Sequence, residues 1–320
     1  MNFTHLIGNT PMLRLRYRLD GREGCVYAKL EAYNLTGSIK DRMAAYILTE
    51  AVGDGTLKPG QPIVEMTSGN TGISFAALGA LAGHPVHIFM PDWASDERKR
   101  LMAMYGARLH TVSREEGGFA AALRGARALA EALGAFQPRQ FENQENPRAH
   151  FLTTGAEILR QLPEVTDLVA GVGSGGTLMG TARRLKEDHP VRAVAVEPDA
   201  VPLLSGGRVN GPHRIEGIGD DFIPAIVDRA LIDSVIGIND LDAVAMAAKL
   251  GRVLGLGVGI SSGANLLAAV LQNIEPGRRV VTVFPDDSKK YLSTLLASPP
   301  AESETMWTSR IELLDLDAAA

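Results

Sequence analysis

Apolar and polar positions along the chain alternate between two periods. Short apolar runs suited to β-strands are followed by longer runs in which apolar residues recur at helical spacing. The first series contains three pairs of a strand and a helix, at 62–66 and 73–83, 85–91 and 95–106, and 107–113 and 117–134. The second series has strand-like runs at 167–173, 192–198 and 278–286 and a helical run at 241–255. This order predicts an α/β fold in which helices cover both faces of mostly parallel sheets.

The segment between the two series is polar and contains prolines. It spans residues 136–150, "FQPRQFENQENPRAH". Such a composition is typical of a connection between structural units, so we expect the chain to cross between two lobes near residue 145, with a cleft between them. The tail after Pro300 departs from the alternating pattern. It is consistent with a docked helix, a contact between subunits or a frayed end.

Charge and cysteine content exclude several classes of partner. The 320 residues include 32 basic and 37 acidic side chains, a net charge of -5, which argues against nucleic acid as a partner. Cys25 is the only cysteine, which excludes an internal disulfide and a multi-cysteine metal site. The apolar run at 73–83 is the longest, and it is shorter than the roughly 20 residues of a membrane span. With no signal-peptide pattern at the N-terminus, a cytoplasmic protein without a metal site or membrane contact is predicted.

A lysine stands at the start of the first long helical run. In residues 34–42, "NLTGSIKDR", Ser38 and Asp41 match the S-x-x-D pattern of a helix start, so Lys40 falls in the first turn. The positive end of a helix disfavours the protonated amine, and a neutral amine is a nucleophile. A solvated lysine whose alkyl chain covers apolar surface gives the same local pattern. Other motifs are needed to distinguish the two interpretations.

Two glycine-bearing loops follow predicted strands. Residues 67–72, "TSGNTG", bring small polar side chains to a helix start, where free backbone N–H groups can hold a carboxylate or a phosphate. Residues 171–177, "GVGSGGT", contain the G-x-G-x-x-G pattern, and Glu197 ends the next strand, as in dinucleotide-binding proteins. Ser174 and Thr177 add hydroxyls that suit a phosphate monoester. A nicotinamide-dependent dehydrogenase and an enzyme with another phosphate-bearing cofactor both fit this loop.

A third loop, residues 257–265 or "GVGISSGAN", again places glycines and serines before a helical run. One ligand would use all three loops and Lys40 if it had an aldehyde for the lysine, a phosphate for the glycine loop and a ring for a serine hydroxyl. Pyridoxal 5'-phosphate has these parts, and a lysine Schiff base is its usual attachment. A dinucleotide would leave Lys40 and residues 67–72 without a role.

Nine segments occur in an order that is also found in a known family. They are "IGNTPMLRL" (7–15), "TGSIKDR" (36–42), "TSGNTG" (67–72), "MPDWASDERKRLMAMYGA" (90–107), "NPRAHFLTTGAEI" (146–158), "GVGSGGT" (171–177), "HRIEGIGDDFIP" (213–224), "GISSGA" (259–264) and "YLST" (291–294). Together they resemble the cysteine synthases, the O-acetylserine sulfhydrylases among the fold-type II, tryptophan synthase β-like, pyridoxal phosphate enzymes. The resemblance covers about residues 5 to 296.

The resemblance implies a two-domain α/β enzyme in which each domain is an open, twisted, mostly parallel sheet flanked by helices. The smaller, mobile N-terminal domain would comprise residues 35–145 with 1–11. The larger C-terminal domain would comprise residues 146–300 with 12–34, and residues 301–320 would form a C-terminal tail. A homodimer is expected, since relatives usually form one.

The resemblance also assigns roles to single residues. Lys40 would hold the cofactor as an internal aldimine and later act as the base for the α-proton. Asn70 would contact the ring hydroxyl and Ser261 the pyridine nitrogen. The phosphate would be held by Gly173, Ser174, Gly175, Gly176 and Thr177. The substrate carboxylate would be bound by Thr67, Ser68, Asn70, Thr71 and Gln140.

The reaction implied is β-replacement, in which O-acetyl-L-serine loses acetate to give an α-aminoacrylate and sulfide then adds to yield L-cysteine. Closure of the small lobe would keep water from this intermediate. Leu35, Ala156 and the segment 285–294 depart from the family pattern. Because relatives with the same core use O-phosphoserine, serine or homocysteine, the donor and the nucleophile stay open, with cystathionine β-synthase and an O-phosphoserine-dependent sulfhydrylase as alternatives. An NAD-dependent dehydrogenase and a non-catalytic relative that keeps the fold are hypotheses from other classes.

Overall fold

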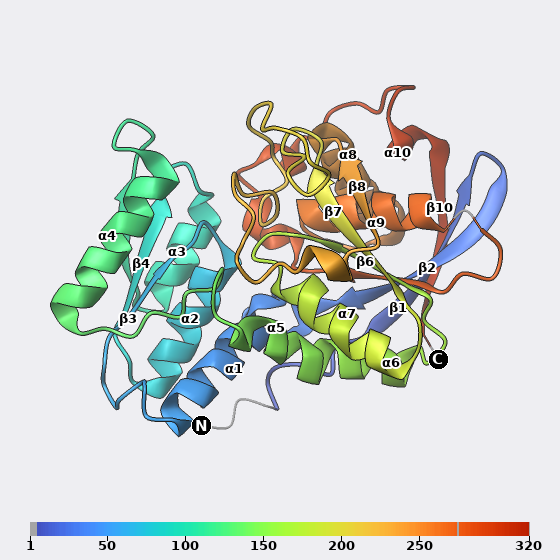
Figure 1. The fold of residues 1–320 in the computed structure, drawn as a ribbon. Helices are drawn as coiled ribbons and strands as arrows, with labels where there is room; N and C mark the ends of the chain where they lie inside the picture. Colours follow the sequence, from blue (N-terminus) through green and yellow to red (C-terminus); the bar gives the residue numbers. More distant parts are fainter. Residues whose placement is uncertain (1–4, 274, 320) are drawn as a thin grey trace.

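Two separate β-sheets form the framework of the molecule (Figure 1). The computed structural model describes residues 5–273 and 275–319. The small sheet has the strand order β3-β4-β5, and the large sheet has the order β10-β1-β2-β9-β6-β7-β8. The predicted α/β organisation, with two mostly parallel sheets flanked by helices, is confirmed.

The small sheet is parallel throughout and is covered on both faces. Its strands are β3 (Ile63–Met66), β4 (Val86–Pro91) and β5 (Arg108–Val112). Helices α1 (Lys40–Gly53), α2 (Asn70–Ala82) and α3 (Asp96–Met104) share one apolar cluster with this sheet, and α4 (Gly118–Leu133) contributes to a second cluster. Every residue of β3 is buried, which is why the strand shows no alternation of apolar and polar residues.

The large sheet combines parallel strands with an antiparallel edge. Its strands are β1 (Met12–Leu19), β2 (Arg22–Leu30), β6 (Asp167–Gly171), β7 (Arg192–Pro198), β8 (Ser234–Ile238), β9 (Val280–Phe284) and β10 (Ile311–Ala318). Only the pairs β10-β1 and β1-β2 are antiparallel. Helices α8 (Asp240–Leu254) and α9 (Ile260–Gln272) share one core cluster with the sheet, while α6 (Ala156–Gln161) and α7 (Gly176–Asp188) belong to another.

Short helical turns connect these elements. Helix α5 (Glu145–His150) continues through a π-helical turn, Phe151–Gly155, into α6. The 3-10 turns are Glu31–Tyr33, Arg229–Leu231, Ser288–Tyr291 and Leu295–Ala297, and α10 spans Trp307–Arg310. No helix among the residues described here combines the length and the apolar character that crossing a bilayer requires.

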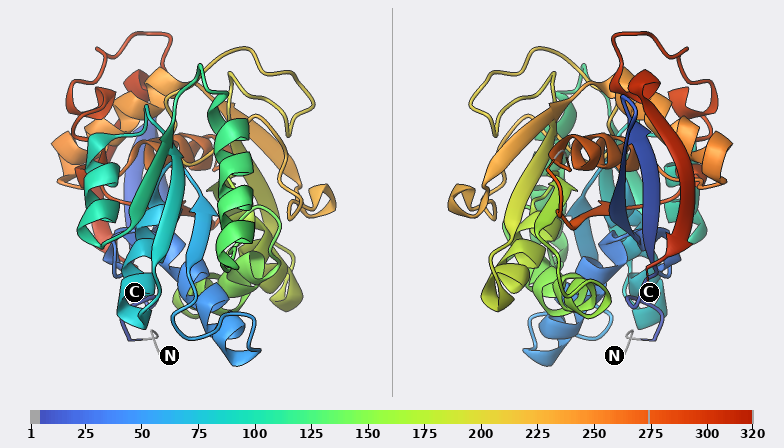
Figure 2. Two further views of the ribbon diagram at one scale, coloured as in Figure 1. Left: turned by 90° about the vertical axis from the view of Figure 1, so that its left-hand side faces the viewer. Right: turned by 90° about the vertical axis from the view of Figure 1, so that its right-hand side faces the viewer.

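The structure corrects the interpretation of the tail. After α10 the chain forms strand β10, which lies against β1 at the edge of the large sheet (Figure 2). The pairing contains an irregularity between Arg16 and Tyr17, and Arg16 forms an ion pair with Asp315 across it. A frayed end is therefore wrong, and a docked helix describes only α10, whose Thr308 donates to Asp242 of α8. Each strand and helix predicted from the two series is present, whereas the domain bounds and the mobility of the small domain stay predictions.

Candidate active site

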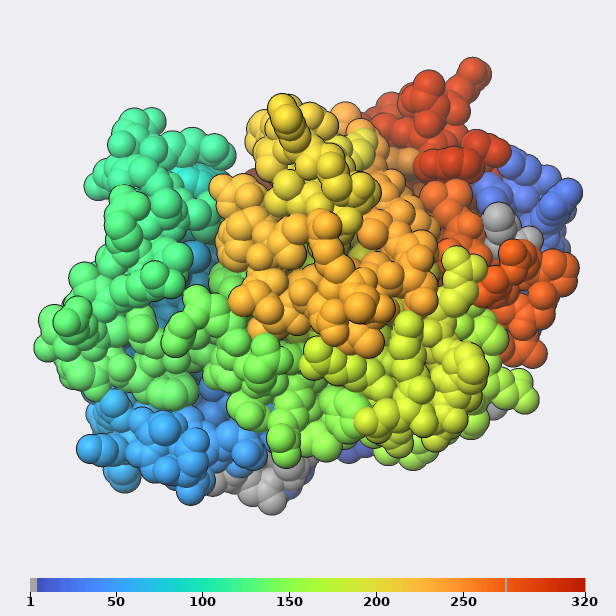
Figure 3. Space-filling model, viewed as in Figure 1, coloured from blue at the N-terminus to red at the C-terminus, as the bar shows by residue number. Residues whose placement is uncertain are grey.

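A cavity opens between the small sheet and the large sheet. Its volume is about 980 Å³, counted together with its open mouth. In Figure 3 a recess separates the green atoms of the small-sheet part from the yellow and orange atoms of the large-sheet part. Met66, Gly171 and Pro285 line the cavity at or just beyond the ends of β3, β6 and β9. This is the edge of parallel sheets at which α/β proteins bind their ligands.

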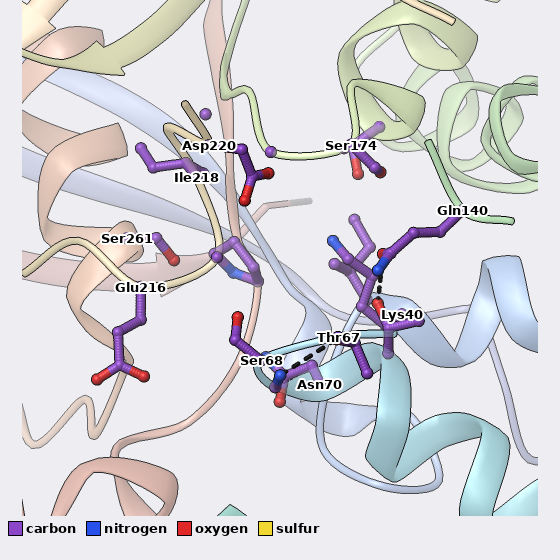
Figure 4. A pocket seen from close by; sticks show the side chains of 18 of the residues that line it. Lys40, Thr67, Ser68, Asn70, Gln140, Ser174, Glu216, Ile218, Asp220 and Ser261 are labelled. Carbon is purple, nitrogen blue, oxygen red and sulfur yellow. Dashed lines mark hydrogen bonds between the residues drawn. The ribbon is translucent and has the colours of Figure 1, made fainter. Parts of the chain in front are cut away.

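The cavity brings together Lys40 and the three loops predicted from the sequence. Close up, side chains from separate elements surround one space (Figure 4). Gly176 alone among the predicted site residues does not line it, because this residue faces Asn146: a Cβ at Gly176 would lie 1.9 Å from the Asn146 Oδ1. The predicted residues that do line the cavity are Lys40, Thr67, Ser68, Asn70, Thr71, Gln140, Gly173, Ser174, Gly175, Thr177 and Ser261.

Lys40 is the first residue of α1, as its sequence context predicted. No hydrogen bond joins its amine to another residue in the described part of the chain. Burial lowers the pKa of Lys40, and the negative charges of Asp286 and Asp220 offset only part of this effect. The expected direction of the shift is thus found, although burial rather than the helix end is its main cause. The lowered pKa makes the neutral amine, which is the nucleophilic form, more accessible than in a free lysine.

The predicted S-x-x-D cap is not formed. No side chain caps the start of α1, and the Asp41 carboxylate turns back to the preceding loop. It accepts hydrogen bonds from the Thr36 N–H at 2.7 Å and from the Ser74 hydroxyl at 2.6 Å. Because Ser74 belongs to α2, Asp41 instead joins the loop before Lys40 to the helix that carries Asn70 and Thr71.

Residues 67–71 form the turn into α2, and Gln140 lies against this turn. The Thr71 hydroxyl donates to Gln140 Oε1 at 2.7 Å, and the Gln140 amide nitrogen donates to the Met66 carbonyl at 3.3 Å. Glu65 holds the backbone of the same loop, because its carboxylate accepts from the Gln140 N–H at 3.3 Å. The start of α2 and the segment around Gln140 therefore form a single polar wall of the cavity.

The glycine loop after β6 is shaped by close approaches of the backbone. A Cβ at Gly173 would lie 2.2 Å from the Gly217 carbonyl oxygen, and Gly175 has a φ of +89, which favours glycine. Ser174 accepts a hydrogen bond from the Asn146 amide at 3.0 Å. The loop leads into α7, so backbone N–H groups and the hydroxyls of Ser174 and Thr177 are gathered at a helix start, which suits a phosphate.

The remaining polar groups fit a pyridine ring. Ser261 lies in the first turn of α9 and presents a hydroxyl to the cavity. Asn70 donates to Asp286 Oδ2 at 2.7 Å, but its own Oδ1 is buried and has no protein partner, and the Oδ1 of Asn265 is in the same state. Buried polar atoms are normally hydrogen-bonded. Pyridoxal 5'-phosphate fits the polar groups of the cavity, which are the Lys40 amine, the glycine loop, the unpaired amide oxygens and the Ser261 hydroxyl.

Several polar residues of the cavity were missed at the level of sequence. Arg98 of α3 forms an ion pair with Glu216 of the opposite loop and lies over the Tyr291 ring, 4.6 Å from its centroid. Asp220 also lines the cavity, and burial, reinforced by the Asp221 charge, raises the pKa of its carboxyl to about 6, against a smaller lowering by Lys40. Glu216 and Asp220 lie in the segment 213–224 that was quoted for the family resemblance. Their pairing and burial depend on how the chain folds, so the local sequence gives no sign of them.

Glu197 does not serve the dinucleotide hypothesis. Its carboxylate accepts hydrogen bonds from the Leu204 N–H at 2.7 Å and from the Ser205 N–H and hydroxyl at 3.1 and 2.6 Å. A ribose hydroxyl would need this carboxylate to be free. Glu197 instead fixes the loop that follows β7. The interpretation of Glu197 as the acidic residue of a dinucleotide-binding site is therefore wrong.

Comparison with known proteins gives a consistent picture. A family model described as "Pyridoxal-phosphate dependent enzyme" matches residues 3–286. The cysteine synthase of Staphylococcus aureus (strain N315) is 42% identical over 302 residues, which are 93% of this chain and 97% of that protein.

Solved structures are similar over nearly the whole chain. A hydrogen sulfide-producing enzyme from Fusobacterium nucleatum is 45% identical, with a TM-score of 0.94, and the match covers 98% of this chain and 97% of that one. An O-acetylserine-dependent cystathionine β-synthase from Helicobacter pylori is 37% identical, with a TM-score of 0.83, and the match covers 92% of this chain and 97% of that one.

Proposed function

Since this chain belongs to the cysteine synthase family of fold-type II pyridoxal-phosphate-dependent enzymes, we propose that it converts O-acetyl-L-serine and sulfide to L-cysteine and acetate. The enzyme class, the cofactor and a β-replacement type of reaction follow from the family. The observation that carries the finer proposal is that Lys40, the polar wall at 67–71, the glycine loop and Ser261 line one cavity. The dehydrogenase hypothesis, which rests on the glycine loop and Glu197, would leave Lys40, residues 67–71 and Ser261 without a role.

The roles proposed for the cofactor site follow from the chemistry of each group. The Lys40 amine would be the attachment point for the cofactor, and it would also be the base that takes the α-proton. Backbone N–H groups of 173–177 would hold the phosphate, and the Asn70 amide would bind the ring hydroxyl. When bound, the cofactor withdraws electrons from the α-carbon of the amino acid. Ser261 offers the ring nitrogen a hydroxyl, which cannot keep it protonated as a carboxylate would, so elimination is favoured over transamination.

The substrate carboxylate is proposed to bind at the start of α2. Free N–H groups of this turn and the partial positive charge of the helix end favour an anion there. The hydroxyls of Thr67 and Ser68 add further donors, and the Thr71 hydroxyl, which donates its proton to Gln140 Oε1, holds Gln140 at the same wall. Binding the carboxylate here would orient the α-carbon toward Lys40 on the neighbouring helix start.

The charges of the cavity favour a neutral acyl donor over O-phosphoserine. Among the residues that line the cavity, only Lys40 and Arg98 are basic, and Arg98 is already paired with Glu216. A donor phosphate would therefore lack a free cation close to it. The same argument disfavours homocysteine as the nucleophile, since its carboxylate would also need a partner, although the similarity to a cystathionine β-synthase keeps this alternative in the test.

The test is an absorbance spectrum of the purified holoenzyme during titration with O-acetyl-L-serine, O-phospho-L-serine and L-serine. We expect a band from the lysine-bound cofactor that changes with O-acetyl-L-serine and not with O-phospho-L-serine. Sulfide and homocysteine are then added separately and the amino-acid products identified. A response to O-phospho-L-serine alone, or cystathionine as the main product, would replace the proposed substrate pair. A cytoplasmic location and a homodimer stay predictions.

Replacing Thr71 with valine is expected to weaken substrate binding. The change keeps the side-chain shape but removes the hydroxyl that donates to Gln140, and one such hydrogen bond contributes about 0.5–1.5 kcal/mol. The KM for O-acetyl-L-serine should rise by about 2- to 12-fold, with a smaller change in kcat. Steady-state kinetics measure both constants. Thr71→Ser, which retains the hydroxyl, is the matched control, and an equal rise of KM in both variants would contradict the role.

A further inference from the structure

Asp220 is an acidic group of the cavity that the proposed roles leave unused. It follows Gly219, whose N–H donates to the Val172 carbonyl at 3.0 Å and whose carbonyl lies 2.9 Å from His213 Nε2. These two contacts fix the loop against the glycine loop after β6. The position of Asp220 relative to the cavity is therefore set by the fold.

The carboxyl group of Asp220 differs from the other acids nearby in having no partner. Glu216, the other acidic residue that lines the cavity, is paired with Arg98, and Asp286 accepts hydrogen bonds from Asn70 and Tyr291. In the described part of the chain, no hydrogen bond or ion pair engages Asp220. A partly exposed acid without a partner at a ligand cavity is available for proton transfer.

The placement of Asp220 separates it from the groups assigned to the α-carbon. Figure 4 shows its carboxyl group pointing into the cavity from the loop that lies across from Ser68 and Asn70. If the substrate carboxylate lies at 67–71 and Lys40 serves the α-carbon, the β-substituent is the part of the substrate left to face the opposite wall. Asp220 and Ile218 belong to that wall.

We propose that Asp220 is the acid that donates a proton to the β-substituent as it leaves, and the base that receives a proton from the nucleophile that replaces it. This rests on the proposed function. In the first half the bond from Cβ to the substituent breaks, its electron pair goes to the substituent, and the Asp220 proton joins the same atom. In the second half the nucleophile bonds to Cβ and its proton passes to the Asp220 carboxylate. With L-serine or L-cysteine as the donor, Asp220 ends as it began, protonated; when acetate leaves without a proton, Asp220 is the base of the second half only if it is ionised from the start, and its proton then returns to solvent.

The consequence is a wider class of donor. Acetate leaves as a weak base and needs no proton, whereas hydroxide and thiolate leave far more easily when protonated. The site should accordingly accept L-serine and L-cysteine, which carry a β-hydroxyl and a β-thiol, in addition to O-acetyl-L-serine. General acid catalysis of this kind contributes about 10²–10⁴-fold to a rate.

The protonation state of Asp220 near neutral pH is set by its surroundings. Burial and the negative charge of Asp221 together raise the pKa of Asp220 to about 6, against a smaller lowering by the Lys40 charge. A group with this pKa can donate and accept protons near neutral pH. The other titratable side chains at the cavity are Lys40, Arg98, Glu216 and Tyr291.

The main test compares donors in the holoenzyme and in Asp220→Asn. The rate of release of the β-substituent is measured in single turnovers with L-cysteine, L-serine and O-acetyl-L-serine. We expect the variant to lose about 10²-fold or more with L-cysteine and L-serine and less than about 5-fold with O-acetyl-L-serine. Asp221→Asn is the matched control, because Asp221 adjoins Asp220 but does not line the cavity, and at pH values where Asp220 is still protonated in this variant it should retain its activity with all three donors.

The pH dependence gives a second measurement. In the wild type, release from L-serine and L-cysteine should fall as the pH rises through about 6, where Asp220 loses its proton. Asp221→Asn removes a charge that raises this pKa, so the fall should move to lower pH. The release of acetate should show no such fall. An infrared titration of the holoenzyme should show a carboxyl signal with the same midpoint that is missing in Asp220→Asn.

Two outcomes would overturn the proposal. One is an equal loss with all three donors, which indicates that Asp220 only positions the site, and the other is a wild type that uses O-acetyl-L-serine but neither L-serine nor L-cysteine. Failure of the proposed function looks different, since the wild type would then release no β-substituent from O-acetyl-L-serine.

Discussion

Lys40→Ala is expected to abolish β-replacement and to remove the absorbance band of the lysine-bound cofactor. The variant loses both the attachment point and the base for the α-proton, and general base catalysis alone contributes about 10²–10⁴-fold, so kcat should fall by at least about 10³-fold. The glycine loop and Ser261 are unchanged, so the cofactor should still bind without a covalent link. Turnover with O-acetyl-L-serine and sulfide, and the visible spectrum before and after dialysis, measure the two effects.

The matched control for this variant is Lys289→Ala. Lys289 lies in the turn Ser288–Tyr291, is exposed and does not line the cavity. Its replacement should leave the spectrum and the turnover unchanged. If the Lys40→Ala protein kept its band and its activity, the lysine-bound cofactor would be excluded, and the whole assignment of the cavity would have to be withdrawn.

The parts of the site that could be predicted from sequence are those with a local signal. A run such as "TSGNTG" combines glycines with small polar residues directly after an apolar strand, and the loop at 171–177 does the same. These residues shape the backbone at the edge of a sheet. Because neighbours in the sequence are also neighbours in the loop, their spacing along the chain is enough to predict this part of the site. For the same reason Lys40 could be placed at a helix start from residues 34–42 alone.

The parts that could not be predicted depend on contacts between distant segments. The ion pair of Arg98 and Glu216 joins α3 to a loop of the large sheet, and the altered pKa of Asp220 results from burial and neighbouring charges in the folded cavity. Residues Ile311–Ala318, which form β10, show an alternating pattern. Predicting this strand required knowing that β1 leaves one of its edges open to pairing with the tail. Side-chain pairing and sheet edges are properties of the fold rather than of short segments.

A buried cluster of charges around Arg42 should be the most sensitive point for stability. The Arg42 guanidinium donates through Nε to Glu31 Oε2 at 2.6 Å and through Nη1 to Glu157 Oε1 at 2.6 Å. It also donates to the Thr10 hydroxyl at 3.1 Å. The side chains of Arg42 and Glu31 are 0% exposed and that of Glu157 is 7% exposed. One side chain of α1 thus neutralises two carboxylates, one beside β2 and one in α6.

Arg42→Ala is therefore expected to lower the free energy of unfolding by about 3–5 kcal/mol, because breaking a buried ion pair leaves an uncompensated charge. Glu157 keeps Lys29, whose amine lies 2.7 Å from Oε2, but Glu31 loses its main partner. Urea denaturation followed by tryptophan fluorescence measures the change. Arg18→Ala is the control, since Arg18 pairs with Glu23 and Glu312 on the exposed surface and should show no measurable loss.

The pH dependence of stability separates this cluster from a simple loss of packing. Burial raises the pKa of Glu157, but hydrogen bonds and charges from Arg42 and Lys29 outweigh it and lower this pKa from 4.5 to about 2. Because the folded pKa is depressed, the ionised carboxylate stabilises the fold above pH 4.5, and this contribution is lost as the pH falls from 4.5 towards 2. In Arg42→Ala the depression is smaller, so the loss of stability over this range should be smaller than in the wild type. Parallel acid titrations of the two proteins measure this difference: a smaller acid loss in Arg42→Ala shows that the cost of the substitution comes from charge, whereas equal losses in both proteins would show that it comes from packing.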